Sequence, residues 1–292
     1  MFERKGSIEV GRRRLLRGTA MFAAGFAMAA ALVGATGAPA WSASLAEIKQ
    51  RGYMTVATED DFRPFEFMKD GKPTGFDNEL LEKLRKVSPV EIRQEMIPWT
   101  GLLAGVSTGK YDLALTAALM TKERQQSLDF TMPIAEATDY YMKRKGDKKI
   151  QTIKDLSGRP LGVQAGSAML AQLPQLEDML AKLGGKMGQV IQYTSYPEAY
   201  QDLAIGRTDY VVNTVINLQT VVQEKPNVFE LGEPVSEKTY IGWAVKKGNT
   251  DLVDFLNKFL AQERENGEMS ALQKKWFGQS FDDMPTSWEA KS

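Results

Sequence analysis

From Ser44 onward, short apolar segments alternate with longer amphipathic ones. Residues 54–58, 90–96 and 111–115 have the composition of buried strands, while the leucines of residues 77–87 recur at helical spacing. Strands that alternate with helices form βαβ units, in which helices flank a mainly parallel sheet. Because 292 residues exceed the usual size of one domain, we expect an α/β protein with two lobes.

The first 40 residues resemble a twin-arginine export signal. Arginines cluster in residues 11–17, an apolar stretch rich in Ala and Gly follows in residues 19–33, and Ala38-Pro39-Ala40 fits a cleavage site. A membrane anchor would need about 20 strongly apolar residues, and this stretch is too weakly apolar and too short before its glycines and proline. We expect cleavage after Ala40 and release into the periplasm.

The composition disfavours several classes of function. Without residues 1–40, which hold six basic and two acidic residues, 31 basic and 35 acidic residues remain, a net charge of −4. This charge does not favour nucleic-acid binding, which requires a basic surface. The chain has no cysteine and no histidine, so it lacks disulfides, a thiol for lipid attachment and the commonest general base. No metal-ligand spacing and no nucleotide-binding glycine loop occurs in the sequence, so we expect neither a metal nor a cofactor. We also expect a monomer.

A candidate anion site follows the strand predicted at residues 111–115. Thr116, Ala117 and Leu119 lie at the carboxyl end of that strand, where α/β sheets bind ligands, and Arg124 follows on a short helical turn. A guanidinium group can bind a carboxylate through two hydrogen bonds. The alternative is a surface arginine in a solvated charge cluster with Lys122 and Glu123.

Several motifs resemble those of family 3 of the bacterial extracellular solute-binding proteins, the polar amino-acid receptors of ABC importers. They are Gly75-Phe76-Asp77, Gly109-Lys110-Tyr111-Asp112, Thr121-Lys122-Glu123-Arg124, Asp129-Phe130 and the ending Trp276-Phe277-Gly278. The resemblance spans residues 45–281. It implies a type II-like periplasmic binding protein with its ligand cleft between the lobes. The first lobe would comprise residues 44–140 and 240–281, the second residues 141–239, and a frayed C-terminal tail residues 282–292, with hinges in residues 140–143 and 239–243.

The same resemblance implies roles for residues at strand ends. Arg124 would clamp the ligand's α-carboxylate, Glu59 would contact its side chain and Phe62 would stack on it. Trp99 stands where the family usually has a phenylalanine that lines the cleft, although it could equally be a core residue. In the second lobe, the strand that contains Gln164 ends in a turn whose Ser167 is placed to cap a helix and would meet the carboxylate from the opposite side.

Asn213 and Thr214 end a later strand of the second lobe. Most amino-acid receptors of the family have an aspartate at the position of Thr214, where it holds the α-amino group, and this chain lacks it. A buried ammonium without an opposite charge is strongly disfavoured. The ligand's amine is therefore expected to be substituted, cyclised or turned towards Glu59. Candidate ligands are an amino acid, an opine, a sugar–amino-acid conjugate or an ectoine-like solute.

We therefore predict a periplasmic substrate-binding protein that closes on a small carboxylate-bearing ligand and delivers it to an inner-membrane ABC permease. The alternative is an enzyme on the same scaffold, similar to periplasmic cyclohexadienyl or arogenate dehydratases. Such an enzyme needs a proton donor, and without histidine Glu59 and Asp60 are the obvious candidates. A third class, the sensor domain of a membrane receptor, would need a transmembrane segment after Phe281, and residues 282–292 are not expected to form one.

Overall fold

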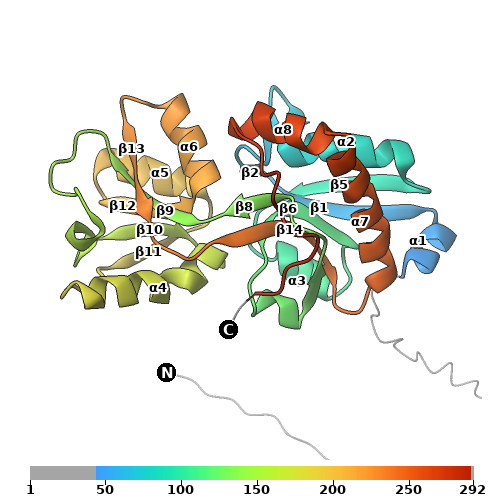
Figure 1. The fold of residues 1–292 in the computed structure, drawn as a ribbon, viewed down its shortest axis with the longest axis horizontal. Helices are drawn as coiled ribbons and strands as arrows, with labels where there is room; N and C mark the ends of the chain where they lie inside the picture. The colour runs from blue at the N-terminus through green and yellow to red at the C-terminus, as the bar shows by residue number, and fades with distance from the viewer. Residues whose placement is uncertain (1–43, 291–292) are drawn as a thin grey trace, which may run out of the picture. The chain divides into compact units, whose positions relative to one another are not determined.

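The computed structural model describes residues 44–290 of the chain, so the expected export signal at residues 1–40 lies outside the described residues. The described chain forms two main sheets, each with its own helices, and one small antiparallel sheet (Figure 1). The α/β fold with two lobes is thus confirmed. None of the helices within residues 44–290 has both the length and the apolar character of a membrane span.

The first lobe is built on a six-stranded sheet with the order β5-β1-β6-β14-β7, in which β8 also pairs with β14. Its strands are β1 (Tyr53–Glu59), β5 (Glu91–Ile97), β6 (Leu113–Leu119), β7 (Leu128–Phe130), β8 (Ala135–Ala137) and β14 (Thr239–Lys246). Its helices are α1 (Leu45–Arg51), α2 (Phe76–Val87), α3 (Leu102–Ser107), α7 (Thr250–Glu265) and α8 (Glu268–Phe277). The small sheet comprises β2 (Asp61–Phe62), β3 (Glu66–Lys69) and β4 (Lys72–Thr74).

Both faces of the first sheet are buried. Successive side chains of a strand point to opposite faces, and Val56 of β1 joins the large core that includes α2, whereas Ala57 joins a smaller core with Leu102 of α3. Helices α2 and α3 accordingly cover opposite faces (Figure 1). The apolar β1 and β6 are therefore interior strands whose carboxyl ends meet at one edge of the sheet.

The second lobe contains a five-stranded sheet with the order β11-β10-β12-β9-β13. Its strands are β9 (Asp139–Arg144), β10 (Leu161–Gln164), β11 (Val190–Tyr193), β12 (Tyr210–Thr214) and β13 (Phe229–Pro234). Helix α4 (Ala168–Lys182) lies on one side of this sheet, and α5 (Tyr196–Ile205) and α6 (Val215–Glu224) lie on the other (Figure 1).

The sheets are mixed, which corrects the expectation of mainly parallel ones. In the first sheet two strand pairs are parallel and three antiparallel. In the second sheet two are parallel and two antiparallel. The physical reason is that β9 and β14 enter their sheets directly from the other lobe, without the helical crossover that parallel pairing requires.

The links between the sheets are shorter than the predicted hinges. The chain changes sheet at Thr138, between β8 and β9, and again in residues 235–238, between β13 and β14. The hinge segments expected at residues 140–143 and 239–243 lie inside β9 and β14, where ladder hydrogen bonds restrict the backbone. A hinge must absorb changes in backbone dihedral angles, so the links are the better candidates.

Asp77 lies inside helix α2, whose N-cap is Gly75. The structure buries its carboxylate, which accepts a hydrogen bond of 2.8 Å from Nε1 of Trp243 in β14. Burial raises the pKa of Asp77 to about 6. Asp77 therefore belongs to the buried interior of the first lobe, where it joins α2 to β14.

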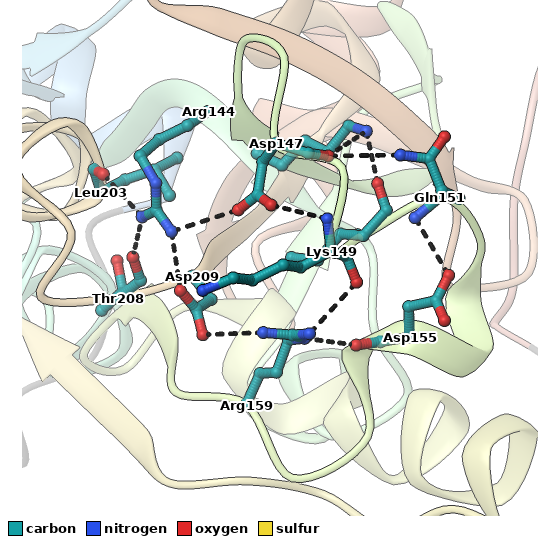
Figure 2. Close-up of polar contacts among 11 residues, drawn as sticks. Arg144, Asp147, Lys149, Gln151, Asp155, Arg159, Leu203, Thr208 and Asp209 are labelled. Atoms are coloured by element: carbon teal, nitrogen blue, oxygen red, sulfur yellow. Dashed lines mark hydrogen bonds and ion pairs between the residues drawn. The ribbon is translucent and has the colours of Figure 1, made fainter.

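A polar network in the second lobe holds the segment after β9 in place (Figure 2). Arg144 donates to Leu203 O at 3.0 Å and to the Asp209 carboxylate at 2.7 Å, and Arg159 reaches the same carboxylate at 3.4 Å. Arg159 also donates to the Asp155 carbonyl at 2.6 Å. Two arginines thus share one acid and several carbonyl groups, which makes the network a structural tie.

The C-terminal segment up to Ala290 packs against the first lobe, which corrects the expectation of a frayed tail. Gln125 donates to Trp288 O at 2.9 Å and accepts from the Ala290 N–H at 3.0 Å. The Trp288 ring lies edge-on to Tyr240 of β14, with ring centroids 4.8 Å apart. Sequence alone did not reveal this packing because the segment has no helical or strand period.

Candidate functional site

A small cavity lies where the two lobes meet at the carboxyl ends of their parallel strands. Its walls contain eight of the eleven predicted site residues: Glu59, Phe62, Trp99, Ala117, Leu119, Arg124, Gln164 and Ser167. Ala168 and Met169 also line it, and sequence reasoning missed both. Counted as space open to the centre of a water molecule, its volume is about 10 Å³. Since that is roughly the space of one water, the lobes must separate before a larger solute can enter.

Arg124 provides the positive charge of this cavity. It begins the short 3-10 helix Arg124–Gln126, and its Nη1 donates to Leu119 O at 3.1 Å. Its guanidinium carbon lies 5.1 Å from the Trp99 ring centroid, within range of a cation–π contact. Arg124 taken as a whole residue is part-buried. Its guanidinium group is the buried part, and this burial lowers the pKa of the group to about 10. An anion beside this buried cation would therefore be strongly favoured.

The amino terminus of α4 lines the cavity from the second lobe. Ser167 is its N-cap, as the sequence predicted, and its Oγ accepts from the Leu170 N–H at 3.1 Å. The preceding Gly166 has φ +69°, a left-handed conformation that favours glycine, and a Cβ there would lie 3.7 Å from Nε1 of Trp99. The remaining free N–H groups of the first turn favour an anion. Anion-binding groups thus meet from both lobes.

Glu59 and Gln164 join the two lobes across the cavity. Glu59 ends β1, Gln164 ends β10, and Nε2 of Gln164 donates to Oε1 of Glu59 at 2.7 Å. Glu59 is only 3% exposed, and burial raises its pKa to about 8 although the Gln164 hydrogen bond and the more distant Arg124 charge oppose the rise. Glu59 is therefore largely protonated at neutral pH in this closed arrangement.

Other contacts between the lobes surround the cavity. The Phe62 ring of the first lobe lies 5.9 Å from the Tyr196 ring of α5, centroid to centroid. The Asn217 side chain of α6 donates to Arg63 O at 2.6 Å, and Asn217 is 1% exposed. These contacts exist only while the lobes are together, so they stabilise closure.

Three predicted residues do not line the cavity. Thr116 is buried in β6 and its hydroxyl bonds to Glu66. The Asn213 side chain donates to the Tyr200 hydroxyl at 2.9 Å and accepts from the Thr214 N–H at 2.7 Å. The Thr214 hydroxyl caps α6 and bonds to the Asn217 side chain. Each of these polar groups is already used within the fold.

Sequence reasoning also passed over Asp139, at the start of β9. It is 1% exposed, and burial raises its pKa to about 7 against the opposing charge of Arg124. The sequence does contain a signal for Asp139, because it is a lone acid at the start of a mostly apolar strand. A fully buried acid without a partner is rare. Within residues 44–290 no three acidic side chains come close enough to hold a metal ion.

Comparison with known proteins places the chain in a family. Residues 54–279 match the sequence model of the bacterial extracellular solute-binding proteins, family 3. The chain is 31% identical over 237 residues to the L-cystine-binding protein TcyJ of Escherichia coli (strain K12), covering 80% of this chain and 86% of TcyJ.

Solved structures show the same architecture. An ancestral arginine-binding protein bound to arginine is similar with a TM-score of 0.69 and 32% identity, over 78% of this chain and 99% of that one. The ancestral amino acid-binding protein AncCDT-1, described as a precursor of cyclohexadienyl dehydratase, is similar with a TM-score of 0.70 and 27% identity, over 80% and 99% of the two chains.

Proposed function

Since the chain belongs to the bacterial extracellular solute-binding proteins, family 3, we propose that it captures an amino acid or amino-acid derivative between its lobes and delivers it to an inner-membrane ABC permease. One relative is named as a cystine-binding protein and another as an arginine-binding protein, which supports an amino-acid ligand. The family description supports a site of action outside the cytoplasm. For this chain we propose the periplasm, with export through the signal expected at residues 1–40.

The observation that carries the proposal is the buried Arg124 guanidinium opposite the amino terminus of α4. Among residues 44–290 the Arg124 guanidinium donates to the neutral Leu119 O and forms no ion pair, so a ligand carboxylate would supply a direct ionic partner. Every ligand class predicted from the sequence carries a carboxylate, so Arg124 fits each of them. Binding would then draw the second lobe onto the ligand through the helix terminus at Ser167.

The proposed contact set comprises the eight predicted residues that line the cavity. Arg124 and Ser167 hold the carboxylate, while Phe62 and Trp99 contribute apolar surface. Ala117, Leu119, Glu59 and Gln164 complete the walls. Thr116, Asn213 and Thr214 are left out because their polar groups bond within the fold.

The test is a binding panel of the common L-amino acids and L-cystine, measured by calorimetry on wild type and Arg124→Ala. Removing one partner of a buried charge pair costs about 2–5 kcal/mol, so affinity should fall by roughly 30-fold or more. Arg124→Lys should also bind weakly because it lacks the planar fork. The matched control is Lys122→Ala, an exposed cation two residues away. Wild-type affinity in Arg124→Ala would refute the anchor.

One observation favours a second candidate, an enzyme of the dehydratase type. Glu59 is a protonated carboxyl group in the cavity and could donate a proton, and AncCDT-1 is described as a precursor of such an enzyme. AncCDT-1 is itself described as an amino acid-binding protein, so the similarity supports binding first. We therefore propose a binding protein without turnover. Incubation with arogenate separates the two: loss of substrate that depends on Glu59 would establish the enzyme.

A further inference from the structure

Asp139 is a buried carboxylate that the fold leaves without a full set of partners. Its main chain is satisfied, since its N–H donates to Oγ of Ser236 at 2.8 Å and its carbonyl accepts from Val235 at 2.7 Å. Its side-chain Oδ1, in contrast, accepts no hydrogen bond from any residue in the range 44–290. A buried acid without partners is unfavourable, so such a group calls for a functional explanation.

The register of the second sheet places Asp139 beside the end of β12. Asp139 of β9 lies directly opposite Thr214 in the antiparallel pair. The neighbouring Val215 N–H donates to Thr138 O at 2.9 Å, which makes the Asp139–Thr214 pair the narrow, non-hydrogen-bonded kind. The Cα atoms of such a pair are about 4.5 Å apart, and both side chains lie on the same face. Asp139 thus brings an acid to the place where Thr214 has only a capping hydroxyl.

Its charged neighbours connect Asp139 to the ligand cavity. Burial raises the pKa of Asp139, and the positive charge of Arg124, which lines the cavity, opposes that rise. Burial also raises the pKa of Tyr196 well above its usual range, and the charge of Asp139 adds to that rise. The Tyr196 ring packs against Phe62 at the same cavity. Yet no ion pair between Arg124 and Asp139 forms among the described residues, whose salt bridges lie elsewhere. Arg124 and Asp139 therefore influence each other electrostatically without forming an ion pair.

We propose that Asp139 binds the ammonium group of the ligand while Arg124 binds its carboxylate. This inference rests on the proposed amino-acid ligand and narrows it to amino acids with a free α-ammonium group. A zwitterion carries both charges a short distance apart and would satisfy both buried groups at once. Glu59 is less suited, because Gln164 already occupies one of its oxygens. The expectation of an amine that is substituted, cyclised or turned towards Glu59 rested on the neutral groups of Asn213 and Thr214. It stays a prediction, and the assignment to Asp139 is the alternative that the tests below separate from it.

The first test compares amino acids with analogues that lack only the amine. The probe pairs are L-histidine with imidazolepropionate, L-arginine with guanidinovalerate and L-cystine with dithiodipropionate, measured by calorimetry on wild type. For any pair whose amino acid binds, we expect the analogue to bind roughly 30-fold or more weakly. Equal affinity within a pair would overturn the inference while leaving the proposed function intact. Failure of every amino acid in the full panel to bind would overturn both.

The second test removes the charge with Asp139→Asn. The preference for the amino acid over its analogue should then fall to roughly threefold or less, because an amide offers hydrogen bonds without charge. The matched control is Asp60→Asn, an exposed acid next to Glu59, which should keep the wild-type preference. If Asp139 served only as a counter-ion for Arg124, both members of each pair would change equally. An unchanged preference in Asp139→Asn would overturn the inference.

A charge swap covers the case in which Asp139→Asn does not fold. The double variant Asp139→Thr with Thr214→Asp moves the carboxylate across the narrow strand pair, and aspartate is as good a helix N-cap as threonine for α6. If it melts cooperatively, it should restore at least a tenfold preference for the amino acid, roughly one third of the wild-type value. A folded swap variant without any preference would overturn the inference.

Discussion

Glu59→Gln should stabilise the protein at pH 8 and have little effect at pH 5. Glu59 is 3% exposed at the junction of the lobes, and burial raises its pKa from the ordinary 4.5 to about 8. Glutamine has the same shape and keeps the oxygen that accepts from Nε2 of Gln164. The substitution therefore removes the titration and preserves the contact.

The magnitude follows from linkage. Because the folded-state pKa is the higher one, the folded protein holds a proton that the unfolded chain releases above about pH 4.5. The corresponding stability is fully present below that pH and is lost as the pH rises towards 8. At about 1.4 kcal/mol per pKa unit, the loss is at most about 5 kcal/mol. Separation of the lobes lets water reach the carboxylate and reduces this value, so we expect about 2–4 kcal/mol.

The assay is urea unfolding of wild type and Glu59→Gln at pH 5 and pH 8, with the exposed Glu177→Gln of α4 as control. Asp139 and Asp77 also have raised pKa values, about 7 and about 6, so both proteins should lose stability as the pH rises. The decisive quantity is the difference between variant and wild type, which should grow with pH only for Glu59→Gln. An equal difference at both pH values would refute the buried, protonated state of Glu59.

Three further substitutions test the cavity, the closure and the C-terminal packing. Trp99→Leu removes the ring near the Arg124 guanidinium, so calorimetry should show roughly tenfold weaker binding with a small change in melting temperature. Comparable losses of affinity and of melting temperature would indicate a core residue. Asn217→Ala removes the hydrogen bond to Arg63 O, worth about 1 kcal/mol, so ligand release measured by stopped flow should become several-fold faster. An unchanged release rate would show that this bond does not hold the lobes together. Trp288→Ala loses its contact with Tyr240 and should lower the melting temperature by about 2–4 °C; an unaltered melting curve would contradict the packing of this segment.

The local features of the site could be read from the sequence. The apolar run predicted as a strand at residues 111–115 overlaps β6 (Leu113–Leu119), which extends four residues further. This run, the turn that leads to Arg124 and the capping position of Ser167 depend on neighbours along the chain. Parallel strands present their carboxyl ends at one edge of a sheet, so residues that end such strands are brought together by the fold class itself. For this reason the cavity contains most of the predicted residues.

Other assignments depended on which strands become neighbours across the sheets. Nothing near Asp139 in the chain indicates that it faces Thr214, because antiparallel pairing joins residues 75 positions apart. The burial of Asp77 against Trp243 is likewise a contact between distant segments. Sequence period identifies a strand but not its partner, and the partner decides whether a carboxylate meets water, a donor or a ligand.

The sequence by itself determined the α/β class, the family and the place of Arg124, the proposed carboxylate anchor, since these depend on short-range pattern and on motifs in a fixed order. Only the tertiary structure decided the location of the links between lobes, the packing of the C-terminal segment on Gln125 and Tyr240, and the acid opposite Thr214. The physical reason is that burial sets the charge state of a carboxyl group, and burial is a property of the assembled core.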